Sequence, residues 1–325
     1  MKGINSSLSQ IADVLEKGKR VLILPHIHPD GDTIGSSIAL SLALKKNKKE
    51  VFILAEDEIP QNLDFLPLEN IHWKIPSGFQ PDIVIAVDAS DVKRLGKRAD
   101  FIHAEIATVN LDHHVTNDYF AQYNYVDFQA AATGEVIYAL LPFLKVSLDD
   151  KIATSIYTAI STDTGSFKYD NTTAKTHQIV SELLRYSIDL SSITTALYQN
   201  KPFSQIKLLG EALNTLELYY SGKLAVIGIT REMLENAKAD ISVVDGLIEF
   251  ARDIKGVEVA VLLKNLSENE IKVGLRSKYD IDVSKIALLF GGGGHKKASG
   301  CTIFSTIENA KKQIIDVLKD NLEFR

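Results

Sequence analysis

Four short apolar runs constrain the fold of the first third of this chain. They read VLILPH (21–26), VFILA (51–55), DIVIAVD (82–88) and ATVNLD (107–112), and helical patterns at 34–46, 133–144 and 149–161 lie between or after them. Runs that are apolar throughout are typical of strands buried on both faces of a parallel sheet. Strands that alternate with helices predict an α/β domain with this sheet at its centre.

The pattern changes twice in the second half. Residues 170–217 read as helical and predict a connector, whereas 223–230, 257–266, 270–277 and CTIF read as strands of a smaller α/β domain. A length of 325 residues is enough for two domains. We therefore expect a catalytic domain over 1–185, a helical linker over 186–214 and a substrate-binding domain over 215–325, with the active site in the cleft between the domains.

Charge and cysteine content narrow the possible partners. The formal net charge of −6 argues against a broad basic surface for long nucleic acid, although a local phosphate pocket stays possible. The single cysteine, Cys301, allows no internal disulfide, which suits a reducing cytoplasm. The first twenty residues read as an amphipathic helix and not as a signal peptide, and no apolar stretch is long enough to span a bilayer. We expect a cytoplasmic protein without a membrane partner.

The segment HIHPDGD places three metal-capable side chains directly after the first apolar run. His26, Asp30 and Asp32 follow a strand-to-helix turn in which Pro29 and Gly31 stiffen and then release the backbone. One aspartate here could simply cap the next helix. A cap needs one such residue, so three favour a ligand site.

Two more apolar runs end in the same way, and a helix ends at a further aspartate. Asp88 follows the third run, and Asp112, His113 and His114 follow the fourth. Asp163 stands where an apolar helix breaks into a polar loop. Each residue alone could be a turn former or a structural side chain. Asp112 could instead orient a ligating histidine through its other ring nitrogen.

Together these segments predict a metal centre at the carboxyl edge of the sheet, where α/β proteins bind ligands. The donors are carboxylates and imidazoles, which suit a divalent ion such as manganese, and the lack of a thiolate disfavours structural zinc. The set is large enough for two ions, with Asp88 and Asp163 as bridges. Two such ions can activate a water for displacement at phosphorus. The predicted ligands are His26, Asp30, Asp32, Asp88, His113 and Asp163.

The sequence FGGGGHKKASG predicts an anion site in the second domain. The glycines Gly291, Gly292, Gly293 and Gly294 allow close backbone approach, and His295 follows them. Arg276, on the preceding strand, could contact a phosphate through two donors. The glycine run could equally be a bare flexible loop, and the arginine a surface charge.

These motifs, in this order and spacing, resemble the DHH phosphoesterase superfamily with its DHHA1 C-terminal domain. The resemblance spans nearly the whole chain and is closest to stand-alone oligoribonucleases (nanoRNases), pAp phosphatases and cyclic-dinucleotide phosphodiesterases. It implies two manganese ions, one held by His26, Asp30, Asp88 and Asp163 and the other by Asp32, Asp88, His113 and Asp163. It further implies that Asp88, His113, His114 and Asp163 act in catalysis, with His114 facing the scissile phosphate. The implied substrate-binding residues are His114, Arg276, Ser277, Gly291, Gly292, Gly293, Gly294 and His295. A homodimer is also implied.

The sequence therefore predicts a hydrolase of short nucleotide phosphoesters, such as pApA, nanoRNA and pAp, with cyclic di-AMP as a further candidate. Two other functions stay open: an inorganic pyrophosphatase or exopolyphosphatase of the same superfamily, and a nucleotide-binding sensor without catalysis. The roles of His28 and Arg94 are left open.

Overall fold

The structure, a computed structural model, describes residues 4–244, 246–267 and 269–321. The chain divides into two compact units, Met1–Asn200 and Lys201–Arg325. The segment 186–214 contains this division: α6 (Leu190–Thr194) and the π-helical turn η4 (Thr195–Gln199) belong to the first unit, and α7 (Phe203–Leu213) to the second. Within the described ranges, every helix is too short or too polar to cross a membrane.

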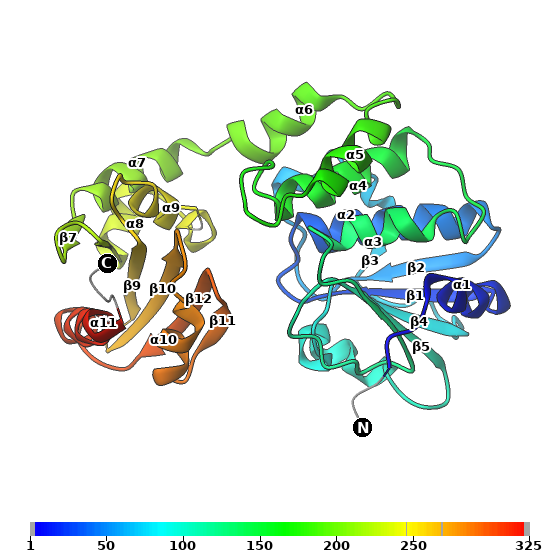
Figure 1. The fold of residues 1–325 in the computed structure, drawn as a ribbon, viewed down its shortest axis with the longest axis horizontal. Coiled ribbons are helices and arrows are strands. Elements are labelled where there is room, and N and C mark those ends of the chain that lie inside the picture. The colour runs from blue at the N-terminus through cyan, green and yellow to red at the C-terminus, as the bar shows by residue number, and fades with distance from the viewer. Residues whose placement is uncertain (1–3, 245, 268, 322–325) are drawn as a thin grey trace. The chain divides into compact units, whose positions relative to one another are not determined.

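The first unit is built on a parallel six-stranded sheet (Figure 1). Its strand order is β3-β2-β1-β4-β5-β6, and every neighbouring pair runs in the same direction. The strands are β1 (Arg20–Pro25), β2 (Glu50–Leu54), β3 (Ile71–His72), β4 (Ile83–Val87), β5 (Ala107–Asp112) and β6 (Tyr123–Val126). The order reverses between β1 and β4, which makes that place the topological switch point of the sheet.

Helices cover one face of this sheet, as Figure 1 shows for α2, α3 and α4. The main core lies there, between β1, β2, β4 and β5 and the helices α1 (Leu8–Lys17), α2 (Gly31–Lys46), α3 (Thr133–Leu140), α4 (Asp150–Asp163) and α5 (Ala174–Leu183). A smaller apolar cluster on the other face packs against η3 (Val92–Phe101) and neighbouring loops. Both faces of the central strands are therefore buried, as their unbroken apolar sequences predicted.

Helices α2 and α4 cross at short range because of Gly35. A Cβ atom at this position would lie 2.5 Å from the carbonyl oxygen of Ser155, closer than any real contact. The glycine thus lets the two backbones touch. The crossing also brings the end of α4, which carries Asp163, toward the start of α2, which carries Asp32.

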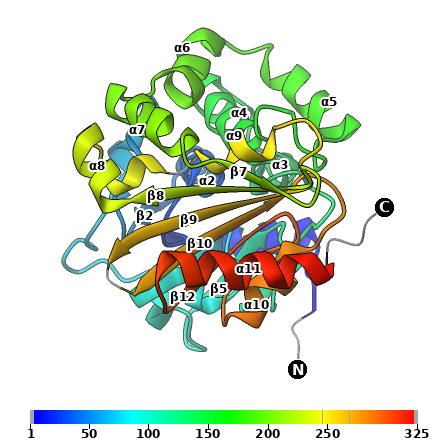
Figure 2. The same ribbon diagram turned by 90° about the vertical axis from the view of Figure 1, so that its left-hand side faces the viewer.

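The second unit has a mixed six-stranded sheet in the order β11-β12-β10-β9-β8-β7 (Figure 2). Only the β8–β9 pair among these strands is parallel. The strands are β7 (Glu217–Tyr219), β8 (Leu224–Thr230), β9 (Val259–Ser267), β10 (Glu270–Ser277), β11 (Gly293–His295) and β12 (Ala298–Ile303). The predicted β9–β10 hairpin is present, with the two strands paired antiparallel.

The two faces of this second sheet are covered unequally. Helices α10 (Val283–Leu289) and α11 (Ile307–Asn321) pack on one face across β8, β9, β10 and β12. On the other face, α7, α8 (Arg231–Ala237), η5 (Ile241–Val244) and α9 (Ile248–Arg252) pack mainly on β8 and β9. Much of β10 and β12 on that face is left without a helix, and a cavity lies there.

The predicted α/β fold is confirmed. The errors of the prediction concern short strands. The edge strands β3 and β6 span only two and four residues and were not predicted. The sequence NTLELYY reads as the end of a helix, but the helical expectation was wrong there: α7 ends at Leu213 and Glu217–Tyr219 pair with β8. Pairing with a neighbouring strand outweighed the local helical pattern.

Candidate functional site

The predicted ligands gather at the carboxyl ends of three neighbouring strands. His26 follows β1, Asp88 follows β4, and His113 and His114 follow β5. Asp30 caps α2, the helix that follows β1, and its Oδ1 accepts hydrogen bonds from the backbone N–H groups of Asp32 and Thr33. These strands flank the topological switch point, where an α/β sheet leaves room for a ligand.

One donor group is formed by His26, Asp30 and Asp88. Their candidate ligand atoms all lie within 4.8 Å of one another. Nε2 of His26 lies 3.7 Å from Oδ1 of Asp30 and 3.4 Å from Oδ2 of Asp88. His26 and Asp88 are buried, and Asp30 is exposed, so the group opens to solvent on one side.

A second donor group is formed by Asp32, His113 and Asp163. Nε2 of His113 lies 3.8 Å from Oδ2 of Asp32 and 3.5 Å from Oδ2 of Asp163. It also lies 3.7 Å from Oδ1 of Asp88. Asp88 therefore stands between the groups, one oxygen toward His26 and the other toward His113. Asp163 belongs to the group around His113.

Asp88 is held in this place by its backbone and by Thr133. Its φ angle of +60° lies in the left-handed region, which aspartate tolerates better than most residues. Its N–H donates to the carbonyl of Leu111 at 2.9 Å, and the hydroxyl of Thr133 donates to its Oδ1 at 2.8 Å.

Residues at the start of α3 and in α2 donate hydrogen bonds to the carboxylate of Asp32. The sequence did not predict these residues. The backbone N–H groups of Thr133 and Gly134 donate to its carboxylate at 2.7 and 3.0 Å, and the hydroxyl of Ser36 donates at 2.9 Å. These partners are neutral groups, and two lie about a hundred residues further along the chain, so nothing in the local sequence marks them.

His26 and His113 present the same ring nitrogen, Nε2, to the carboxylates. Nδ1 of His26 lies 2.7 Å from the carbonyl oxygen of Ile27, and Nδ1 of His113 lies 3.1 Å from that of Ala130. A ring N–H that donates to a carbonyl leaves Nε2 as the ligand atom, which is the usual arrangement at protein metal sites. The donor set therefore fits one or more divalent cations.

The ionisation of the cluster agrees with a site built for cations. Burial lowers the pKa of His26, but the carboxylates of Asp30 and Asp88 outweigh this effect and raise it to about 10. Burial raises the pKa of Asp163 to about 6. It likewise raises the pKa of Asp32, and the charges of Asp88 and Asp163 add to the increase. Protons thus partly balance the buried charge, and a divalent cation could take their place.

His114 is oriented by Asp112 and lies beside His113. Its Nδ1 is also 3.6 Å from Oδ1 of Asp88, so Asp88, His113 and His114 form a third possible donor group. The same Nδ1 lies 2.7 Å from Oδ1 of Asp112, which is fully buried. The side-chain amide of Asn117 donates to the other oxygen of Asp112 at 2.6 Å. Asp112 therefore supports His114, whereas the backbone carbonyl of Ala130 supports His113. Burial lowers the pKa of His114, but Asp112 and Asp88 raise it above its ordinary value.

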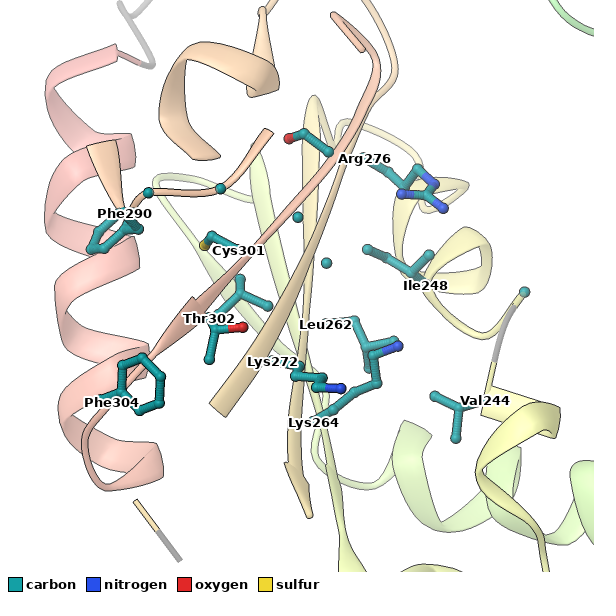
Figure 3. A pocket seen from close by; sticks show the side chains of 17 residues that line it. Val244, Ile248, Leu262, Lys264, Lys272, Arg276, Phe290, Cys301, Thr302 and Phe304 are labelled. Carbon is teal, nitrogen blue, oxygen red and sulfur yellow. The ribbon is translucent and has the colours of Figure 1, made fainter. Parts of the chain in front are cut away.

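The remaining predicted residues lie in the second unit, around a cavity of about 810 Å³ (Figure 3). Arg276, Gly291 and Gly292 line it. Nε of Arg276 lies 3.3 Å from Oε1 of Glu249, in α9. Ser277 is buried on the opposite face of β10 and is not among the lining residues, and Gly293 and Gly294 are likewise absent from the lining. His295, in β11, pairs with Ala298 of β12, and its side chain is outside the described part.

His28 and Arg94 lie beside the strand ends without joining either donor group. The backbone N–H of His28 donates to Oδ2 of Asp57 at 2.7 Å, and its exposed ring lies 3.5 Å from the same carboxylate. The carbonyl of Arg94 accepts from the N–H of Ile27 at 2.7 Å. Both therefore help to fix the loop after β1.

Two family models match this chain in the order in which the units occur. Residues 20–160 match the model described as "DHH family, N-terminal domain", and residues 222–323 match the "DHHA1 domain". The first match contains all the cluster residues except Asp163, and the second contains the cavity strands.

Relatives whose names state an activity match over almost their full length. The bifunctional oligoribonuclease and PAP phosphatase NrnA of Thermus thermophilus is 33% identical over 318 residues, which cover 96% of this chain and 93% of that protein. The protein of the same name from Bacillus subtilis is 29% identical over 289 residues, which cover 88% and 90%.

Solved structures share the architecture. An exopolyphosphatase-related protein from Bacteroides fragilis matches with a TM-score of 0.89 at 25% identity, covering 96% of this chain and 95% of that chain. RecJ of Thermus thermophilus, solved with Mn²⁺, matches with a TM-score of 0.55 at 14% identity and covers 100% of this chain and 56% of that chain. The second likeness concerns the fold alone.

Proposed function

Given that this chain belongs to the DHH family of phosphoester hydrolases, we propose that it cleaves short nucleotides to mononucleotides. The proposed substrates are linear dinucleotides such as pApA, nanoRNA and pAp. The observation that carries the proposal is the pair of donor groups beside the carboxyl ends of β1, β4 and β5, one containing Asp88 and the other adjoining it. The oligoribonuclease and PAP phosphatase activities of the related NrnA proteins support the choice of substrates.

The first unit holds the residues proposed for metal binding. His26, Asp30 and Asp88 would hold one divalent ion, and Asp32, His113 and Asp163 a second, with Asp88 adjoining both. Manganese is the proposed metal because the set combines imidazole nitrogens with several carboxylate oxygens and no thiolate. Such ions supply a water of lowered pKa and electrostatic stabilisation of the charge on the phosphoryl and leaving oxygens.

His114 is proposed to contact the phosphate that reacts. Asp112 fixes the ring through Nδ1 and favours the protonated form of the imidazole. An imidazolium can donate a hydrogen bond to a phosphoryl oxygen and can supply a proton to a leaving oxygen. Because its carboxylate partner is buried and is itself hydrogen-bonded by Asn117, the ring is held in one orientation before substrate arrives.

The second unit is proposed to bind the rest of the substrate. Arg276 and the backbone of Gly291 and Gly292 line the cavity and can contact phosphate oxygens. Ser277, Gly293, Gly294 and His295 remain proposed substrate contacts that lie in β10 and β11 beside it. The proposed substrates are short, and residues of both units are proposed to contact them. The net charge of −6 also disfavours length-independent binding of long nucleic acid.

A substrate panel with purified protein tests the proposal. The protein is stripped with a chelator, reloaded with Mn²⁺, and mixed separately with pAp, pApA, a five-nucleotide RNA, cyclic di-AMP and pyrophosphate. We expect mononucleotide from the first three and little phosphate from pyrophosphate. Release of phosphate from pyrophosphate without mononucleotide from any nucleotide would replace the proposal with a pyrophosphatase, and binding without turnover would indicate a sensor. The cyclic dinucleotide shows whether ring opening also occurs.

Two finer parts of the proposal concern location and assembly. Cys301 is the single cysteine, and it is buried as a free thiol, so the fold needs no oxidising compartment. A cytoplasmic location is proposed on that ground. The homodimer implied by the family resemblance stays a prediction, and size-exclusion chromatography with light scattering measures it.

A further inference from the structure

The cavity of the second unit extends well beyond Arg276. It lies on the face of β10 and β12 that α9 leaves uncovered, and its volume of about 810 Å³ is near the upper end for sites that hold a drug-sized ligand. Alternate residues of β10 face it, from Lys272 through Gly274 to Arg276. Four residues of strand separate Lys272 from Arg276 by about 13 Å. The cavity thus has two cationic ends.

The end away from Arg276 carries two lysines in directly opposed positions. Lys272 of β10 pairs with Lys264 of β9, and both line the cavity. In Figure 3 their amino ends turn to the same side of the sheet. Two ammonium groups on one side of a sheet can both donate hydrogen bonds to one phosphate, the anion that the proposed substrates carry.

Gly274 forms the floor of the cavity between its two cationic ends, and packing does not require a glycine there. Gly274 lacks a positive φ angle, and a Cβ atom there would make only ordinary contacts, at 3.7 Å to Ile248 and 3.8 Å to Leu262. Glycine within a strand weakens it and often marks a place where a ligand approaches the backbone closely. Gly300 of β12 is its cross-strand partner, so the floor is bare on both strands.

An aromatic ring stands at the lysine end. Phe304 follows directly after β12, lines the cavity and is 79% exposed. Thr302, two residues earlier, pairs with Lys272, which places Phe304 just beyond the lysine pair. Aromatic rings next to cationic side chains are the usual elements of sites for single-stranded nucleic acid, because every base can stack on a ring.

From these observations we infer that Lys264, Lys272 and Phe304 form a second nucleotide subsite, which binds a phosphate and base of the substrate chain beyond the nucleotide held at Arg276. The inference rests on the proposed function, since it concerns the same substrates. The inference predicts that the protein prefers longer oligonucleotides to pAp. A chain of three to five nucleotides reaches both cationic ends of the cavity, whereas pAp does not.

The test compares substrates of increasing length with lysine variants of the full chain. Lys272→Gln, Lys264→Gln and the double variant are assayed on pAp and on 5′-phosphorylated oligoadenylates of two, three and five residues. We expect the ratio of kcat/KM for the five-residue substrate to that for pAp to fall in each variant. The slope of log(kcat/KM) against log(salt) for the five-residue substrate should become shallower by about 0.7 for each lysine removed. Phe304→Leu should lower the same ratio without changing the slope.

Lys312→Gln is the matched control. Lys312 is exposed on α11, which covers the opposite face of the sheet, so the variant loses the same charge away from the cavity. Its length ratio and salt slope should equal those of the wild type. An equal loss on pAp and on the longest substrate in the cavity variants, or no loss on either, would overturn the inference.

A binding measurement separates this inference from the proposed function. The anisotropy of a labelled five-residue oligoadenylate is followed with chelator present, so that hydrolysis does not contribute. If the wild type hydrolyses no nucleotide but Lys272→Gln binds the oligoadenylate more weakly than the wild type does, the subsite is retained and the proposed function is removed. Hydrolysis by the wild type with unchanged binding in the double variant would remove the subsite alone.

Discussion

Oδ2 of Asp88 lies 3.4 Å from Nε2 of His26, so the carboxylate after β4 faces the imidazole after β1. Its other oxygen lies 3.7 Å from Nε2 of His113, after β5. A single side chain thus adjoins both donor groups. Residues that follow three strands, β1, β4 and β5, face one another at this carboxylate. Its removal should therefore disturb both donor groups.

Asp88→Asn is expected to lower kcat by more than about 100-fold, because even residues that only orient metal ligands cost 10- to 100-fold when they are changed. Steady-state hydrolysis of pApA measures the loss, and elemental analysis measures the metal that is retained. The matched control is Asp91→Asn, three residues later, whose carboxylate caps η3 and belongs to neither donor group. Full activity in Asp88→Asn would contradict the proposed role.

Asp112→Asn should lower kcat by about 10- to 100-fold while the metal content stays the same. The substitution removes the buried charge that favours the protonated form of His114 but leaves both donor groups in place. Turnover and metal content are measured on the same preparation. Loss of metal in this variant would show that Asp112 acts on the donor groups, contrary to its contacts.

Metal removal should destabilise the first unit. A ligand that binds only the folded protein, at a hundred times its dissociation constant, stabilises by about 2.7 kcal/mol. We expect Mn²⁺ to raise the melting temperature of the wild type and chelator to reverse the change, with a much smaller shift for Asp88→Asn. Differential scanning calorimetry measures both proteins. Equal shifts would indicate that the ion binds elsewhere.

Gly274→Ala should stabilise the second unit by about 0.5–1 kcal/mol, since alanine loses less backbone freedom within a strand. The added methyl group occupies the cavity floor, so KM for oligonucleotides should rise. Gly210→Ala is the control: Gly210 lies in α7 with open space around it, and its replacement should stabilise by about 1 kcal/mol with KM unchanged. Thermal denaturation and initial-rate kinetics provide the two readouts.

Asp82 gives a pH-dependent contribution to stability. A side-chain hydrogen bond from Arg20, together with backbone N–H groups of Arg20 and Lys19, lowers its pKa to about 2. A lowered pKa stabilises the fold above the ordinary value of 3.8, and this stabilisation is lost as the pH falls through 2. Solvent screening limits it to about 1 kcal/mol.

Asp82→Asn should therefore melt below the wild type at pH 6, and the difference should shrink between pH 4 and pH 2. Asp13→Asn, an exposed change in α1, should match the wild type at every pH. A difference that stayed constant with pH would show that the ion pair with Arg20 is not its source.

The sequence predicted the central strands and the cluster for one physical reason. Strands buried on both faces are apolar throughout, and polar residues directly after them must lie at one edge of the sheet. Thr133 and Gly134 could not be found this way, because their backbone N–H groups reach Asp32 only through tertiary structure. Lys264 and Lys272 read as polar positions of a hairpin, and only the strand register shows that they are opposed.

Gly35 bears no reactive group, yet it governs the distance between two carboxylates, one in the first turn of α2 and the other at the end of α4. Any side chain at this crossing would wedge α2 and α4 apart and widen the gap between Asp32 and Asp163. An inactivating lesion can therefore arise in the helical scaffold, with every ligand intact, and a mutational survey confined to titratable residues would overlook it.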